Sequence, residues 1–158
     1  MTIRLSTFTR NGMLAGSGFK TLFAHGCIEI RSGPQPTDAD SAATGTLLGL
    51  VTVGAGSFTP GTSTNGLTFD NPVAGTISKA AAENWQWVGI ADGIAGWFRL
   101  RGNPADAGAA DPSFTLARMD GSIANSGADL LMSNVQIATG APDAITQFAW
   151  TLLASAQY

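Results

Sequence analysis

The chain has 158 residues, a length typical of one domain that can bury a core of its own. The net charge is −3 and the eight basic residues are scattered, which argues against a nucleic-acid-binding protein, because such proteins cluster Lys and Arg. The single cysteine excludes an intrachain disulfide, and no apolar run approaches the roughly 20 residues of a membrane helix, so no membrane partner is expected.

Charged residues make up 12% of the chain, about half of the roughly 25% that is usual in globular proteins. A surface that is poor in charge and rich in Gly, Ala, Ser and Thr is poorly protected against association. Either neighbouring subunits cover much of this surface, or the chain is a monomer with a neutral surface. We favour the first interpretation and expect a homo-oligomer.

Residues 1–25 are predicted to form an N-terminal arm with a short helix. They lack the apolar core of a signal peptide, so we expect folding in a reducing cytoplasm. Ser6 or Thr7 can cap a helix that lies between Ser6 and Ala24, and Gly26 ends it. Three glycines weaken this helix by about 1 kcal/mol each relative to alanine and make it marginal: Gly12, Gly16 and Gly18.

Residues 26–158 carry the signals of short strands and turns. Cys27–Arg31 alternates apolar and polar residues, which places Ile28 and Ile30 on one face. Thr46–Val53 is apolar on both faces, as expected of a strand that is covered on both sides. Further short strands are predicted after the Asn65-Gly66 turn signal and later in the chain: Leu67–Phe69, Thr76–Ser78, Leu130–Met132 and Val135–Ile137.

An Asp-Gly turn signal at Asp92-Gly93 predicts a hairpin. Trp85–Ile90 would form its first arm and Ala95–Arg101 its second. In the second arm, strict alternation places one set of side chains opposite the other: Phe98 and Leu100 on one face, and Trp97, Arg99 and Arg101 on the other.

A second hairpin is predicted at Asp120-Gly121, between Phe114–Met119 and Ser122–Ala124. A last strand, Ala144–Leu153, would place three side chains on one face: Phe148, Trp150 and Leu152.

Two long loops interrupt these strands, Gly33–Gly45 and Gly102–Ser113. Each is either an arm that reaches a neighbouring subunit or an ordinary mobile connection, and both interpretations stay open.

About eight to ten short strands, with a turn signal roughly every ten residues, predict an all-β fold. We expect an antiparallel β-sandwich or jelly roll with a short N-terminal helix. No internal repeat or linker divides the chain, so residues 1–158 are expected to form a single domain, with the sandwich in residues 26–158.

The sequence contains few residues that could carry catalysis. His25 and Cys27 are the only residues of their types, and on a strand their side chains would share a face. A packing or surface role is the better interpretation, because no carboxylate is placed to orient the pair. Asp38 and Asp40 could offer oxygen ligands to calcium, but the EF-hand pattern is absent and local turns are favoured. We therefore expect no enzyme, no metal and no cofactor.

Aromatic residues are the remaining candidates for a site. Trp85, Trp87 and Trp97, with Phe58 in the Gly54–Gly61 loop, are candidates for a protein interface. For these three tryptophans and for Trp150, core packing is the favoured interpretation, an interface the second, and a platform for carbohydrate the third.

Five segments occur in a characteristic order along most of the chain: Ser6–Asn11, Ile28–Pro36, Gly45–Leu48, Ala95–Leu100 and Ser126–Leu130. In these segments and their order, the chain resembles a group of small virion proteins of tailed bacteriophages. The chain departs from the group in an Ala- and Gly-rich insert around Asn103–Pro112 and in a longer segment at Trp85–Trp87.

The resemblance implies a structural component of the virion, assembled in the host cytoplasm. We expect a capsid decoration (cement) protein that acts by multivalent packing on other virion proteins, such as the major capsid protein. A neck, collar or tail component is the alternative that the resemblance leaves open. A carbohydrate-binding β-sandwich module is the alternative from another class.

Overall fold

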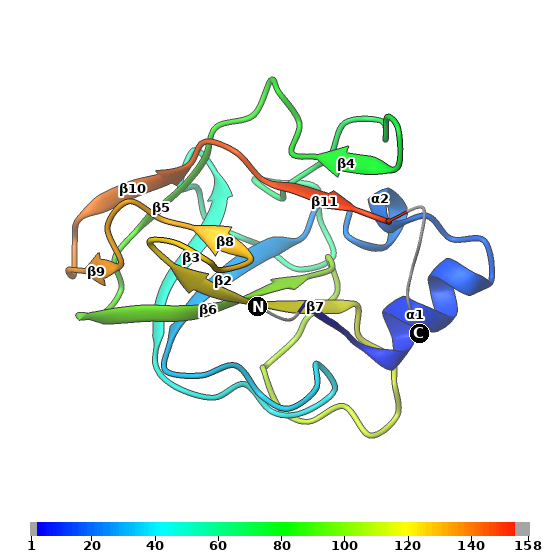
Figure 1. Ribbon diagram of the computed structural model, residues 1–158, viewed down its shortest axis with the longest axis horizontal. Coiled ribbons are helices and arrows are strands. Elements are labelled where there is room, and N and C mark those ends of the chain that lie inside the picture. The colour runs from blue at the N-terminus through cyan, green and yellow to red at the C-terminus, as the bar shows by residue number, and fades with distance from the viewer. Residues whose placement is uncertain (1–2, 154–158) are drawn as a thin grey trace.

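The computed structural model describes residues 3–153. They form eleven strands and two short helices, shown in Figure 1. The all-β prediction is confirmed. In chain order the elements are β1 (Arg4–Leu5), α1 (Thr7–Leu14), α2 (Phe19–Leu22), β2 (Cys27–Ser32), β3 (Leu47–Val53), β4 (Thr76–Ser78), β5 (Trp85–Val88), β6 (Gly93–Arg101), β7 (Arg118–Ala124), β8 (Leu130–Leu131), β9 (Gln136–Ile137), β10 (Pro142–Ile145) and β11 (Ala149–Thr151).

The predicted N-terminal helix exists, divided into α1 and α2. Ser6 caps α1, because its Oγ accepts a hydrogen bond from the backbone N–H of Thr9 at 3.2 Å. Asp40, from a distant loop, accepts a second bond from the N–H of Thr7 at 3.0 Å. The chain leaves α1 at Ala15, and Gly16 then adopts a φ of 97°, which a helix cannot contain.

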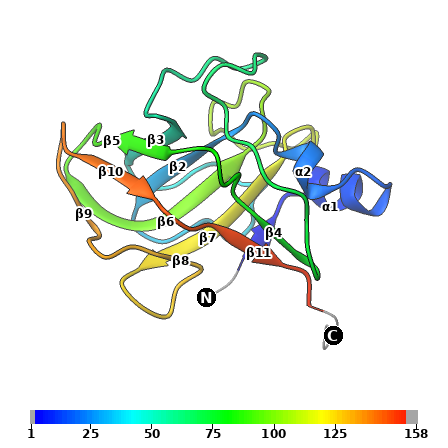
Figure 2. The ribbon, with the colours of Figure 1, turned by 90° about the horizontal axis from the view of Figure 1, so that it is seen from above.

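Nine strands form one large sheet, in the order β1-β7-β6-β2-β3-β5-β10, with β8 beside β7 and β9 beside β6. All strand pairs are antiparallel except β7–β8, which is parallel. A second sheet contains β4 and β11. The residues from β10 to β11, which we call the strap, run across one face of the large sheet (Figure 2).

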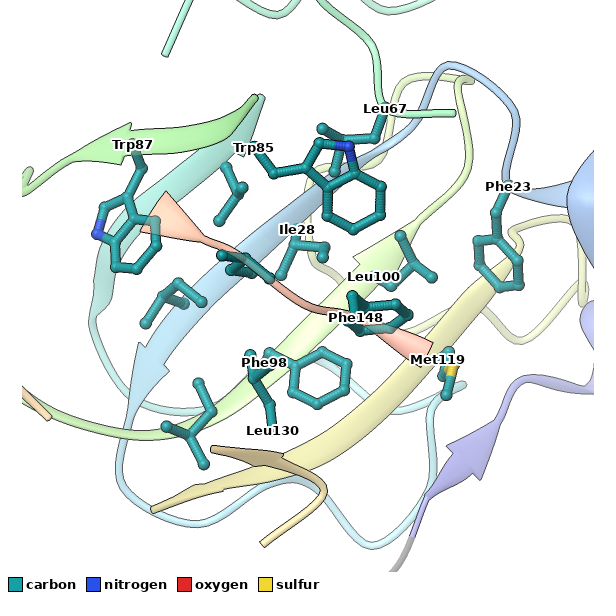
Figure 3. Close-up of a cluster of buried hydrophobic side chains, with 14 of the residues drawn as sticks. Phe23, Ile28, Leu67, Trp85, Trp87, Phe98, Leu100, Met119, Leu130 and Phe148 are labelled. Carbon is teal, nitrogen blue, oxygen red and sulfur yellow. The ribbon is translucent and has the colours of Figure 1, made fainter. Parts of the chain in front are cut away.

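The aromatic core lies between the large sheet and the strap. Alternation on the central strands aligns Ile30 with Phe98 and Phe98 with Gly121 on the core side. Phe148 of the strap lies over this face, with its ring centroid 6.0 Å from that of Phe98 and 5.6 Å from that of Trp85 (Figure 3). The sheet and the strap with β4 thus form the two layers of a sandwich.

The first predicted hairpin is wrong in its pairing, although both of its arms are strands. β5 pairs with β3 and β10, whereas β6 pairs with β2, β7 and β9. Two strands, β2 and β3, separate the two arms in the sheet. The Asp92-Gly93 signal marks a change of direction, but β2 pairs with β6 along six residues and so takes the place beside it.

The second predicted hairpin does not exist. Asp120-Gly121 lies in the middle of the continuous strand β7. The residues are explained by packing: Asp120 bonds to Arg99, and Gly121 leaves room for the ring of Phe98. A Cβ atom at Gly121 would lie 2.6 Å from Cε1 of Phe98.

Two other strand predictions are partly wrong. Leu67 and Phe69 form only isolated bridges, to Gly26 and Lys79. The predicted last strand is divided into β10 and β11, because its first part pairs with β5 and its second with β4.

The close approach at Gly121 gives a test of the core packing. Gly121→Ala should lower the free energy of unfolding by about 1–3 kcal/mol, because the methyl group must displace the Phe98 ring. Gly18→Ala is the matched control, since a Cβ there meets nothing within 4 Å, and should change stability by less than about 0.5 kcal/mol. Urea denaturation measures both. Equal effects of the two substitutions would contradict the packing described here.

Candidate functional site

The face of the large sheet opposite the aromatic core carries charged side chains, and we call it the charged face. Successive side chains of a strand point to opposite faces of the sheet. The residues that alternate with the apolar core residues therefore lie on the charged face. Register aligns Glu29 with Arg99, and Arg99 with Asp120, across three adjacent strands. The charged face contains Cys27, Glu29, Arg31, Trp97, Arg99, Arg101, Arg118 and Asp120.

Arg99 and Asp120 form the centre of the charged face. Two hydrogen bonds of 2.7 and 2.8 Å join the guanidinium to the carboxylate, and both side chains are fully buried. Burial raises the pKa of the Asp120 carboxyl, and the bonds from Arg99 oppose this effect. A charge pair without access to water is costly to break, because either partner left alone would be a buried unpaired charge.

Arg118 and Asp106 form a second ion pair, between β7 and the loop after β6. Its two hydrogen bonds measure 2.6 and 2.7 Å. Burial alone would raise the pKa of Asp106. The hydrogen bonds from Arg118 and from the N–H of Gly108 outweigh it and hold this pKa below its ordinary value of 3.8.

The arginines of the charged face also hold the two long loops. Arg118 donates to the carbonyls of Ala39 and Ala109, and Arg99 donates to the carbonyl of Ser41. Arg101 donates to the carbonyl of Asp106. The loops 33–45 and 102–113, which were candidates for interaction arms, therefore lie over the sheet and shield the charged face from water.

His25 and Cys27 are not joined by a hydrogen bond in the described part of the chain. Sγ of Cys27 accepts a bond from Nε of Arg101 at 3.0 Å, and burial raises the pKa of the thiol to about 11. A thiol with this pKa is protonated at neutral pH, whereas a nucleophilic cysteine must form a thiolate. The carbonyl of His25 accepts a bond from the side chain of Asn103. The pair thus has the geometry of packed side chains.

The tryptophans proposed as interface residues lie inside the protein. Trp85, Trp87 and Trp97 are 1%, 1% and 0% exposed, so their rings cannot reach a partner of the folded chain. Trp85 and Trp87 point into the aromatic core, and Trp97 lies on the charged face near Arg99. Core packing, the favoured interpretation, is what the structure shows. Phe58 is half-buried, with the guanidinium of Arg101 5.3 Å from its ring centroid.

Asp38 forms local turn bonds, as the favoured interpretation predicted, whereas Asp40 bonds to the distant Thr7. Asp38 accepts bonds from the N–H and Oγ of Ser41 at 2.8 and 2.9 Å. Asp40 supports the start of α1 through Thr7. Within residues 3–153, no group of three or more His, Cys, Asp or Glu side chains is arranged to hold a metal ion.

The clearest surface feature is apolar and lies where the two helices meet β4 and β11. A hollow of about 440 Å³ opens there between Met13, Ile77 and Trp150. Trp150 forms one wall, stacked on Phe19 with ring centroids 4.8 Å apart. We define the apolar end surface as this hollow and the exposed side chains next to it: Leu14, Val73, Leu152 and Leu153, which are 88%, 75%, 58% and 74% exposed.

Comparison with protein-family models, with curated proteins and with solved structures gives no match. None of the helices in the described residues is long and apolar enough to span a membrane.

Sequence reasoning missed both the charged face as a buried site and the apolar end surface. The alternation of Arg99 and Arg101 with apolar residues was visible, but the loops that bury these arginines carry no sequence signal for it. The pattern Phe148, Trp150, Leu152 was visible too. It did not show that Phe148 enters the core while Leu152 stays exposed.

The buried ion pair can be tested by double substitution. Asp120→Leu should lower the free energy of unfolding by about 3–5 kcal/mol, because it leaves Arg99 as a buried unpaired cation. Adding Arg99→Met should restore part of this loss, since no charge is then stranded. Chemical denaturation of the single and double variants measures the coupling. A double variant less stable than Asp120→Leu would be evidence against this description.

The lowered pKa of Asp106 predicts how its contribution depends on pH. A carboxyl with a depressed pKa in the folded state stabilises the protein above its unfolded pKa, near 3.8, and loses this contribution as the pH falls through its folded pKa. Asp106→Asn should therefore cost about 3 kcal/mol at pH 7 and progressively less below pH 4. Thermal unfolding of both proteins across this range measures the difference. A cost that does not change with pH would contradict the assignment.

Proposed function

We propose that this chain is a structural component of a tailed-bacteriophage virion and acts by packing against other protein chains, as a capsid decoration protein. The observation that carries the proposal is the apolar end surface. Leu152 lines the hollow, Leu14, Val73 and Leu153 each directly follow a lining residue in the chain, and all four side chains are 58% or more exposed. Contiguous apolar patches of this kind mark sites of protein association. The virion context comes from the sequence resemblance.

The distribution of charge supports the same function. Of the 8 basic and 11 acidic residues, all of which lie in the described part of the chain, five are exposed: Arg10, Asp38, Asp70, Asp92 and Asp143. The charged face holds four of the basic residues internally: Arg31, Arg99, Arg101 and Arg118. The outer surface is thus even poorer in charge than the composition, and charge depletion is typical of the centres of interfaces.

The same distribution supports a protein partner over a nucleic acid. A nucleic-acid-binding surface needs several free basic side chains in one place. Here Lys20 bonds to Asn71 and Lys79 donates to the carbonyl of Glu83, while Arg4 donates to the carbonyl of Pro36. Carbohydrate binding is less favoured, because three of the four tryptophans considered for it are buried and only Trp150 is half-buried.

The decisive experiment combines native mass with binding to particles. The purified chain is analysed by light scattering and then mixed with particles of the encoding phage that were assembled without this gene product. We expect a stable oligomer that coats the heads. Binding at one vertex only would instead assign the chain to the neck, collar or tail. A monomer that binds no part of the particle would overturn the proposal.

Substitution locates the contact surface. Leu14→Asp with Leu152→Asp should weaken oligomer formation or particle binding by at least about tenfold, because each aspartate must be desolvated in the interface. Ile94→Asp is the matched control. Ile94 is 58% exposed and pairs with β9, at the opposite end of the molecule from α1 (Figure 1). Equal loss in both variants would rule out the apolar end surface as the contact.

A further inference from the structure

Within residues 3–153, one edge of β11 has no backbone hydrogen-bonding partner. Phe148, Trp150 and Leu152 bond to the β4 side, as shown by the bonds from Lys79 N–H to the Phe148 carbonyl and from Leu152 N–H to the Gly75 carbonyl, both 2.9 Å. In an antiparallel pair the alternate residues point their N–H and C=O groups the other way. The backbone groups of Ala149 and Thr151 therefore face away from β4, and within the described residues nothing bonds to them.

The two outer strands of the large sheet are protected, whereas this edge of the second sheet is not. β10 begins with Pro142 and carries Asp143, and β1 carries Arg4. Proline and charge both discourage the addition of another strand. Residues 145–153 contain no charge, glycine or proline. A strand edge of this composition favours pairing with another chain.

The unpaired edge borders a groove. An opening of about 550 Å³ lies between strap residues 143–149 and residues 129–133, and a second of about 250 Å³ lies between β11 and Ile3, Met119 and Ala128. The two openings share Asp129, Phe148 and Ala149, so they lie next to each other along the strap, and we call them together the groove. Polar and apolar side chains both line it, and its size suits an extended segment of about five or six residues.

We propose that this groove binds an extended segment of a partner protein, which adds to the free edge of β11 as a new strand. Strand addition obtains affinity from backbone hydrogen bonds and selectivity from the pockets for alternate side chains. The lining includes the exposed carboxylate of Asp143 and, among its described residues, no basic side chain. Charge complementarity therefore favours an extended segment that carries a lysine or arginine beside Asp143. The partner's identity as a virion protein rests on the proposed function, whereas the groove does not.

A designed peptide tests the groove directly. The probe is a fluorescent heptapeptide of alternating valine and threonine with one central lysine. We expect it to bind the full chain and to slow hydrogen exchange of the Ala149 and Thr151 amides at least about tenfold. The same peptide with N-methyl groups on the edge that faces β11 should not bind. Equal binding of the methylated peptide would overturn the proposal.

One substitution removes the donor and keeps the backbone hydrogen bonds to β4, although it loses the bond between the Thr151 and Thr76 hydroxyls, as Thr151→Ala does too. Thr151→Pro deletes an N–H that points into the groove, and proline is tolerated at such edge positions. It should reduce peptide binding at least about tenfold, whereas Thr151→Ala, which keeps the N–H, should bind as the natural chain does. Asp143→Asn should weaken binding of the lysine peptide by about two- to fivefold, and it should leave binding of the same peptide with glutamine in place of lysine unchanged. If Thr151→Pro fails to fold, the comparison of the methylated with the unmethylated peptide still tests whether binding needs backbone hydrogen bonds to β11.

The outcomes separate this inference from the proposed function. Particle binding without peptide binding would overturn the proposal that the groove binds a strand, and it would leave the proposed structural role intact. Peptide binding without particle binding would support the groove and remove the virion assignment. Slowed exchange at Ala149 and Thr151 that appears with rising protein concentration and no peptide would overturn the proposal in favour of a second copy.

Discussion

Arg99 and Asp120 meet across two central strands without access to water, and the rest of the fold is arranged around this contact. Their strands show an apolar face to the strap and a charged face to the loops, so the large sheet is buried on both sides by different means. Dispersion and the hydrophobic effect hold the strap. Charge-assisted bonds from Arg99, Arg101 and Arg118 to backbone carbonyls hold loops that have little apolar surface of their own.

This division explains how a charge-poor chain with many glycines and alanines forms a defined structure. Its charges are concentrated where they fix the loops, and its surface is left neutral. A neutral surface with one apolar end suits a protein that acts by contact. Internal ion pairs fix the shape of the contact surface without adding charge to it. A rigid surface with little charge fits the proposed assembly into a larger particle better than it fits binding of a charged ligand.

The sequence predicted the positions of the strands better than it predicted which strands pair with each other. Alternation located β2 and β6 and assigned their faces correctly, because side-chain period is a local property. Pairing is not local. Asp92-Gly93 and Asp120-Gly121 have the same turn signal, yet the first stands at the start of β6 and the second lies inside β7. In β7, Asp120 is explained by its bond to Arg99 and Gly121 by its contact with Phe98. Burial of Trp97 was the favoured interpretation, but the sequence did not show that this ring would be buried beside Arg99 on the charged face and not in the aromatic core.

The position of the strap in the chain has a consequence for biosynthesis. β1 pairs with β7, and β2 with β6, so residues far apart in the sequence must both have emerged from the ribosome before the sheet can form. Phe148, which covers the aromatic core, comes later than ten of the eleven strands, and only β11 follows it among the described residues. A nascent chain that lacks the strap exposes Phe69, Trp85 and Phe98 together. Cotranslational folding of this chain is therefore expected to complete late, with the aromatic core open to chaperones until the strap is released.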